Sequence, residues 1–137
     1  MFASGADLRE IAEVTADTAR EFSLRGQALM NMIASLKPLT VAAVNGYCFG
    51  GALDLALACD RRIASSKAIF SHPGTGLGII TGWGGTQRLP RLIGRANALE
   101  MFLTAGRFDA NEALRIGLVD QVADDVLETA LVIASGS

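Results

Sequence analysis

The sequence predicts an α/β fold with parallel strands, in one domain that spans residues 1–137. Leu39–Val44 is a short β-branched run without polar alternation, which is typical of a strand buried on both faces. A glycine-rich turn follows, then a run of small and aliphatic residues (51–60) that predicts a helix, then residues 61–71 as one strand or two short ones. Strand, helix and strand in this order form a crossover unit, which joins parallel strands.

The segment before this unit predicts a helix over residues 17–36, because Phe22, Leu29 and Ile33 recur at helical spacing between charged residues. Pro38 ends that helix, since a proline disfavours helical backbone in the residue before it. The first residues, "MFASGADLREI", pass from small residues into a charged, helix-compatible stretch.

The segment after the unit is rich in glycine, and we expect no regular helix there before about Thr86. Residues 96–104 and 110–116 predict two short helices. "GLVDQVAD" then predicts a strand and a turn, and "VLETALVIASGS" begins a last helix.

Composition and charge limit the class of protein. Half of the residues are hydrophobic and 19% are charged, which is too apolar for a disordered chain. A net charge of −2 gives no electrostatic reason to expect nucleic acid or an anionic membrane as a partner. No apolar run reaches spanning length, and Cys48 and Cys59 lie in apolar sequence, which favours two free thiols. We expect a cytoplasmic protein without a metal site.

The glycines between the predicted strand and helix are the first candidate functional feature. Gly50 and Gly51 cost backbone entropy, so something should need bare backbone there. A helix that begins near Gly51 offers free N–H groups and a partial positive charge at its start. The alternative is a tight turn with close strand–helix packing and no ligand.

Four segments resemble, in order and spacing, the crotonase (enoyl-CoA hydratase/isomerase) superfamily. They are "FASGADLREI", "KPLTVAAVNGYCFGGALDLALACDRRIAS", "FSHPGTGLGIITGWGGTQRLPRLIG" and "ALRIGLVDQV". The resemblance implies a crotonase-like (ClpP/crotonase) ββα superhelix. Members of the superfamily are longer at both ends, so we expect a truncated central portion without the N-terminal strands and the C-terminal helical region.

The resemblance also implies a substrate and a way of binding it. Superfamily members bind an acyl-coenzyme A thioester and stabilise its enolate oxygen with two backbone N–H groups, here those of Ala6 and Gly51. Coenzyme A then enters as part of the substrate, and no other cofactor is expected. Members assemble as trimers and hexamers, so a homotrimer or hexamer is expected here.

The acid–base residues depart from the superfamily pattern. Its two glutamates correspond to Asp54, which is shorter by one methylene, and to Gly74, which can neither donate nor accept a proton. Asp54 could act alone as acid or base, or it could be a structural partner of Arg61 or Arg62. His72 is the second candidate, because histidine side chains often transfer protons in enzymes, although a packing role is the alternative.

The resemblance implies further contacts with the substrate. Arg9 could pair with phosphate or ribose oxygens of coenzyme A, or it could be a solvated helix charge. The indole of Trp83 could form a wall of the acyl pocket, and Thr75 or Thr81 could position a water molecule. The predicted substrate-binding residues are Ala6, Asp7, Leu8, Arg9, Gly50, Gly51, Gly74 and Trp83.

Two other functions stay open. "GYCFG" fits the pattern that places a nucleophile on a turn between strand and helix, so Cys48 with His72 would make a cysteine hydrolase. A fast-reacting thiol of low pKa would favour that function. The second alternative is a weak or inactive acyl-CoA-binding homologue, because the second glutamate is absent and fold does not fix function.

Overall fold

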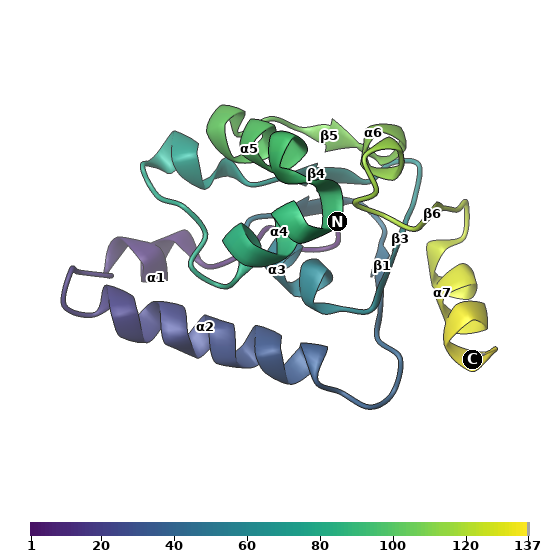
Figure 1. Cartoon of the computed structure of the whole chain (residues 1–137), viewed down its shortest axis with the longest axis horizontal. Helices are drawn as coiled ribbons and strands as arrows, with labels where there is room; N and C mark the ends of the chain where they lie inside the picture. Colours follow the sequence, from purple (N-terminus) through teal and green to yellow (C-terminus); the bar gives the residue numbers. More distant parts are fainter. Residues whose placement is uncertain (137) are drawn as a thin grey trace.

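The strands of the protein build two small sheets that helices surround (Figure 1). The computed structural model describes residues 1–136, so Ser137, the last residue of the predicted domain, lies outside the described residues. The first sheet has the order β1-β3-β6, from β1 (Val41–Val44), β3 (Arg61–Ala64) and β6 (Gln121–Val122). The second sheet has the order β2-β4-β5, from β2 (Tyr47–Phe49), β4 (Ile69–Ser71) and β5 (Phe108–Asp109).

The predicted crossover unit is present. β1 and β3 run parallel, with Val41 opposite Arg61 and Val44 opposite Ala64, and helix α3 (Gly51–Ala58) connects their ends. The predicted strand region 61–71 is two strands, β3 and β4, which belong to different sheets. The predicted glycine turn holds a strand of its own, β2, which pairs parallel with β4. This strand was not expected; its backbone also forms a bridge with Ala3, and Cys48 at its centre is buried in the core.

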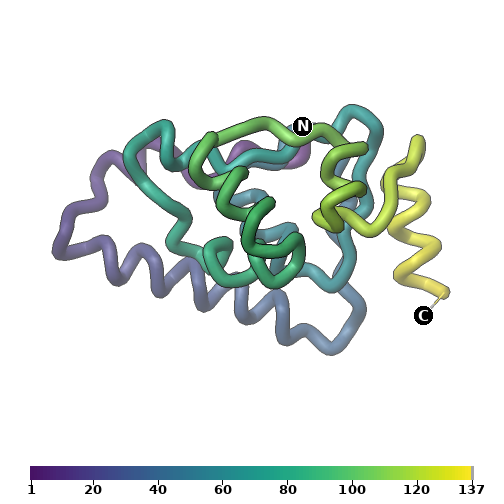
Figure 2. The backbone as a smooth tube through the Cα atoms, turned by 45° about the horizontal axis from the view of Figure 1, so that its top comes forward, coloured from purple at the N-terminus to yellow at the C-terminus, as the bar shows by residue number. Residues whose placement is uncertain are grey.

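The other helices follow the predicted order. They are α1 (Leu8–Ala12), α2 (Ala19–Ala34), the 3-10 turn η1 (Pro73–Leu77), α4 (Gly85–Ile93), α5 (Arg95–Thr104), α6 (Ala110–Arg115) and α7 (Val126–Ser135). The long helix α2 runs along one side of the molecule, and α7 lies at the end opposite α1 in both views (Figures 1 and 2). None of the helices within residues 1–136 is both long enough and apolar enough to cross a membrane.

Helix α3 lies at the centre of the hydrophobic core. Leu53 and Ala56 on this helix are fully buried, and they belong to one cluster with Phe70, Leu89 and Met101. Burial of a side chain as large as leucine or phenylalanine contributes about 1.5–3 kcal/mol. The position of the first turn of α3 is therefore determined by packing on several sides.

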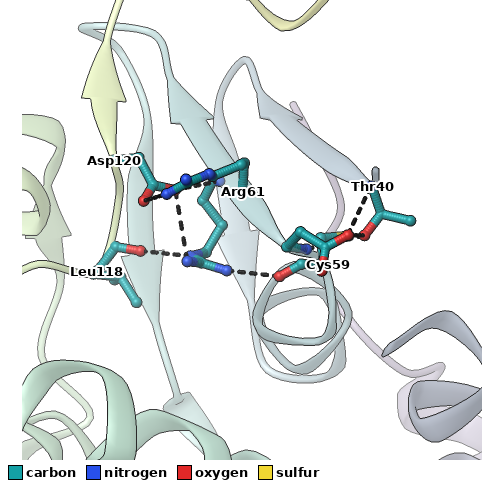
Figure 3. A network of polar contacts seen from close by, with 7 residues as sticks. Thr40, Cys59, Arg61, Leu118 and Asp120 are labelled. Atoms are coloured by element: carbon teal, nitrogen blue, oxygen red, sulfur yellow. Dashed lines mark hydrogen bonds and ion pairs between the residues drawn. The ribbon is translucent and has the colours of Figure 1, made fainter. Parts of the chain in front are cut away.

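A network of polar contacts joins the end of α3 to the first sheet (Figure 3). The guanidinium of Arg62 donates to the carbonyls of Leu118 (2.9 Å) and Cys59 (2.8 Å), and it lies 3.6 Å from the carboxylate of Asp120. Asp120 also accepts from the backbone N–H of Arg62 (2.8 Å) and from the side chain of Arg61 (3.3 Å). Both arginines thus belong to this network, and the alternative that either one pairs with Asp54 is wrong.

A second polar contact closes the connection between α3 and the start of β3, beside β1. The carboxylate of Asp60 accepts from the N–H (2.9 Å) and the hydroxyl (2.8 Å) of Thr40, whose hydroxyl accepts from the Asp60 N–H (2.9 Å). These hydrogen bonds hold the pKa of Asp60 below its ordinary value.

Candidate active site

Two backbone amides lie close together where the N-terminal segment meets the start of α3. Ala3 forms a parallel bridge with Cys48, and the N–H of Phe49 donates to the Ala3 carbonyl (3.2 Å), so the chain leading to Ala6 lies along β2. A β-carbon placed on Gly51 would lie 3.4 Å from the Ala6 nitrogen. Within residues 1–136, neither of these two N–H groups has an acceptor.

The conformation of Gly50 makes this approach possible. Its φ of 55° and ψ of −122° lie in a region that residues other than glycine rarely adopt. The chain therefore turns sharply from β2 into α3, and the first N–H groups of the helix stay free of side-chain caps. The partial positive charge of the helix start adds to these two N–H donors.

A buried carboxylate and a buried imidazole meet one helical turn beyond Gly51. Asp54 is 1% exposed and His72, which follows β4, is 3% exposed. One carboxylate oxygen, Oδ2, accepts from the hydroxyl of Thr81, and the other, Oδ1, lies 3.3 Å from Nε2 of His72. That contact lacks hydrogen-bond alignment, so within the described chain Oδ1 and Nε2 have no hydrogen-bond partner. Buried polar atoms are normally paired, so this pair has capacity left for another group.

Gly85, the first residue of α4, leaves space for the Asp54–His72 pair because it has no side chain. A β-carbon on Gly85 would overlap Oδ1 of Asp54 and would lie 2.8 Å from Thr81 Cγ2 and 3.2 Å from His72 Nε2. Gly84, with a φ of 105°, starts the helix in a conformation that favours glycine. The glycine pair of "GWGGTQRL" is therefore needed for close packing of α4 against the carboxylate.

The two amides, the carboxylate, the imidazole and the Thr81 hydroxyl border one cavity of about 300 Å³. Its polar part holds the Ala6 and Gly51 backbone, Asp54, His72 and Thr81. The rest is mainly apolar, and its larger side chains are Leu8, Ile11, Val14, Phe22, Leu77, Ile79, Ile80 and Trp83. Two backbone amides, a buried carboxylate–imidazole pair and an apolar wall thus border the same space.

Most of the predicted site residues reach this cavity, and two do not. Ala6, Leu8, Gly50, Gly51, Asp54, His72, Gly74 and Trp83 line it. Asp7 and Arg9 instead pair with each other on the surface, at 2.9 Å, and the side chain of Arg9 is 91% exposed. The Arg9 guanidinium holds the pKa of Asp7 below its ordinary value, and the same carboxylate caps α1. In this structure the two side chains form a helix cap outside the cavity wall.

The two threonine candidates have different roles, and other parts of the site were not found from the sequence. Thr75 donates to the Phe102 carbonyl (2.6 Å), so it holds the fold, whereas Thr81 bonds Asp54 directly. The role of Gly85 was missed, although two adjacent glycines before a helix are a signal of close backbone approach. The apolar lining from α1 and the following loop carries no local motif.

The structure contradicts a nucleophilic role for Cys48. The residue is fully buried in strand β2, and burial, together with the charge of Asp54, raises the pKa of its thiol to about 12. A thiol of this kind is protonated near neutral pH and is a poor nucleophile. The cysteine hydrolase alternative is therefore wrong.

The fold and the cavity together define a class of protein, and comparison with known proteins agrees with it. Residues 1–135 match the sequence profile of the enoyl-CoA hydratase/isomerase family. The chain belongs to this family, which confirms the predicted crotonase-like fold.

Individual relatives are similar over almost the whole chain. A crotonyl-CoA hydratase of Syntrophomonas wolfei is 47% identical over 88% of this chain and 46% of its own length. A short-chain-enoyl-CoA hydratase of Clostridium acetobutylicum is 43% identical over 98% of this chain and 52% of its own length. The chain thus spans about half the length of these curated relatives.

Solved structures give the same result. The structure of Pseudomonas aeruginosa DspI matches with a TM-score of 0.94 and 40% identity, over 99% of this chain and 57% of that one. An enoyl-CoA hydratase of Bacillus anthracis matches with a TM-score of 0.89 and 41% identity, over 97% of this chain and 52% of that one.

Proposed function

We propose that this chain binds an acyl-coenzyme A thioester and supports hydratase or isomerase chemistry by stabilising the thioester enolate. The observation that carries the proposal is that Ala6 and Gly51, whose N–H groups are free, lie close together at a cavity that Asp54 and His72 also line. The similarity to a crotonyl-CoA hydratase and to a short-chain-enoyl-CoA hydratase supports the same class.

The two amides act on the thioester oxygen. As a proton leaves or reaches the α-carbon, negative charge develops on this oxygen, and the N–H groups of Ala6 and Gly51 donate to it. Both donors are held by backbone packing before the substrate arrives, so little reorganisation opposes the reaction. Removal of one such donor typically raises the barrier by about 2.7–4 kcal/mol.

Asp54 and His72 take the place of the two glutamates of the family. Thr81 holds one oxygen of the Asp54 carboxylate, and the other oxygen faces the imidazole. The carboxylate orients the ring and stabilises it when protonated, and the imidazole exchanges a proton with the bound acyl group. A single pair of this kind suits a double-bond shift, in which one proton is removed from one carbon and returned to another. It also supports hydration if the pair activates the water that adds to the β-carbon.

Location in the cytoplasm and assembly as a homotrimer or hexamer belong to the same proposal. Both thiols are free, which agrees with a reducing compartment. Large apolar side chains are exposed on the outer helices, among them Leu103 on α5 and Leu131 on α7. Association of several copies of the chain would cover these apolar side chains. Light scattering after gel filtration measures the mass of the assembly.

The test of the function is turnover of crotonyl-CoA, and of a 3-enoyl-CoA for isomerisation, by the purified chain. We expect Asp54→Asn and His72→Gln each to lower kcat by about 10²–10⁴-fold. The control Asp124→Asn changes an exposed carboxylate outside the cavity and should leave kcat unchanged. Tight binding of acyl-CoA without turnover of either substrate would contradict the proposal and would favour the inactive homologue.

A further inference from the structure

Trp83 fills a slot between two glycines. A β-carbon on Gly26, which is buried in the middle of α2, would overlap the five-membered ring of the indole. A β-carbon on Gly51 would lie 2.6 Å from Cζ3 at the opposite end of the ring system. The indole therefore extends from α2 to the residue that supplies an oxyanion N–H, with no free space at either end.

The backbone next to the indole is also held. The side-chain amide of Gln27 donates to the Gly82 carbonyl (2.8 Å), and the Trp83 N–H lies 3.4 Å from the Thr81 hydroxyl oxygen. The ring of Phe22 packs against the indole with centroids 5.5 Å apart. Since main chain and side chain are both fixed, the indole acts as a rigid wall rather than a movable side chain.

The position of this wall limits the acyl group. With a thioester oxygen held by Ala6 and Gly51, the acyl group enters the cavity that Asp54 and His72 also line, and its remaining carbons continue into the apolar part. Trp83 lines that part and fills the space between Gly51 and Gly26. A longer chain therefore meets the indole instead of passing between α2 and α3.

We propose that Trp83 is a specificity-determining residue that restricts this site to short acyl chains. The inference rests on the proposed function, because it takes the thioester oxygen to lie between the two amides. Gly26 and Gly51 are the positioning residues, since their missing side chains determine where the indole lies.

The main experiment compares kcat/KM for four-, eight- and twelve-carbon trans-2-enoyl-CoA substrates. We expect the wild type to prefer the short substrate and Trp83→Ala to raise the twelve- to four-carbon ratio by about tenfold or more, because one methylene in an apolar pocket is worth about tenfold. Trp83→Phe should raise the same ratio by a smaller factor. This variant replaces Trp83→Ala in the experiment if the alanine variant does not fold.

A second variant, Gly26→Ala, changes the contact of the indole with α2. Gly26→Ala should push the indole toward Gly51 and lower kcat/KM for every chain length. Gly76→Ala should not, because apart from the chain neighbours no heavy atom lies within 4 Å of the new β-carbon. In the Trp83→Ala background the Gly26→Ala change should lose its effect, since contacting residues are coupled. Equal effects of Gly26→Ala in both backgrounds would overturn the inference.

A readout without turnover separates this inference from the proposed function. Trp83 is the only tryptophan of the chain, so its emission reports directly on an acyl group at the wall. We expect octanoyl-CoA to shift the emission and coenzyme A alone to leave it unchanged. An unshifted emission, or a chain-length ratio that Trp83→Ala does not change, overturns the inference. A shifted emission without turnover of any enoyl-CoA contradicts only the proposed function.

Discussion

Gly85→Ala is the sharpest perturbation of the candidate site, because it adds one methyl group at the meeting point of three polar side chains. The new β-carbon overlaps Oδ1 of Asp54 and lies 2.8 Å from Thr81 Cγ2 and 3.2 Å from His72 Nε2. Carbon atoms do not approach oxygen so closely, and the short side chain of Asp54 comes from a buried helix. The carboxylate must therefore rotate away from Thr81, from His72, or from both.

The size of the effect follows from these contacts. A hydrogen bond to a charged group contributes about 1.5–3 kcal/mol, which is lost if Asp54 moves away from its partner. Alanine stabilises a helix by up to about 1 kcal/mol relative to glycine, which offsets part of this loss. We expect a net loss of about 1–2 kcal/mol in the free energy of unfolding. The misplaced carboxylate no longer orients His72, so kcat should fall by about 10²-fold or more.

The assays are crotonyl-CoA turnover and urea unfolding, with Gly76→Ala as the matched control. Gly76 has no heavy atom within 4 Å of the position that a β-carbon would take, and it does not line the cavity. Its alanine variant should keep both activity and stability. If Gly85→Ala is as active as the wild type and equally stable or more stable, the close packing of α4 on Asp54 does not determine the geometry of the site.

Three other predictions concern the rest of the chain. Cys48 should resist iodoacetamide at pH 8 in the folded protein and react in urea, because burial raises the pKa of its thiol to about 12; mass spectrometry measures the labelling. Asp60→Asn should lower stability at neutral pH and have less effect in acid, because hydrogen bonds from Thr40 lower the pKa of Asp60 in the folded state. That stabilisation is present above the pKa of Asp60 in the unfolded chain and is lost as the pH falls through its lower pKa in the folded protein. Urea midpoints of the wild type and the variant, measured at pH 7 and at pH 3, test this. Asp120→Asn should cost about 1–3 kcal/mol in urea unfolding, because it weakens the network around the buried Arg62.

Each of these predictions has a control or a contrary result. Labelling of Cys48 in the folded protein as fast as in urea would show that its thiol is accessible. An Asp60→Asn effect that is the same at both pH values would remove the role given to its ionised form. Glu112→Gln breaks an exposed pair with Arg115 that is worth little, so a loss as large as that of Asp120→Asn would argue against the importance of the Arg62 network.

The fold was predictable because strong local signals agreed along the chain. The β-branched run before Asn45 and the small, aliphatic run after Gly50 predicted the crossover unit, and the structure confirms it. Strand β2 was missed because Tyr47–Phe49 lies among glycines, and three residues are too few for a visible alternation. Its pairing with β4 depends on residues more than 20 positions away, which local patterns do not report.

The candidate site was predictable in its positions and not in its contacts. The resemblance pointed to Ala6 and Gly51, and the structure brings their N–H groups close together, while their catalytic role stays a prediction. Asp54 and His72 were considered as separate candidates, because 18 positions of sequence give no sign that the two side chains meet. Their contact depends on α4 packing against α3 through Gly85, a tertiary arrangement without a local pattern.

The attachment of the first residues to β2 has a consequence for how heat inactivates the protein. Ala6 is held in place by a few backbone hydrogen bonds between Phe2, Ala3 and strand β2, whereas Gly51 starts a helix surrounded by the core. The backbone of Ala6 and that of Gly51 therefore differ in local stability. Detachment of the amino-terminal segment on warming would separate the donors while the helices and the core stay intact, so catalysis should fail at a lower temperature than the cooperative melting of the chain.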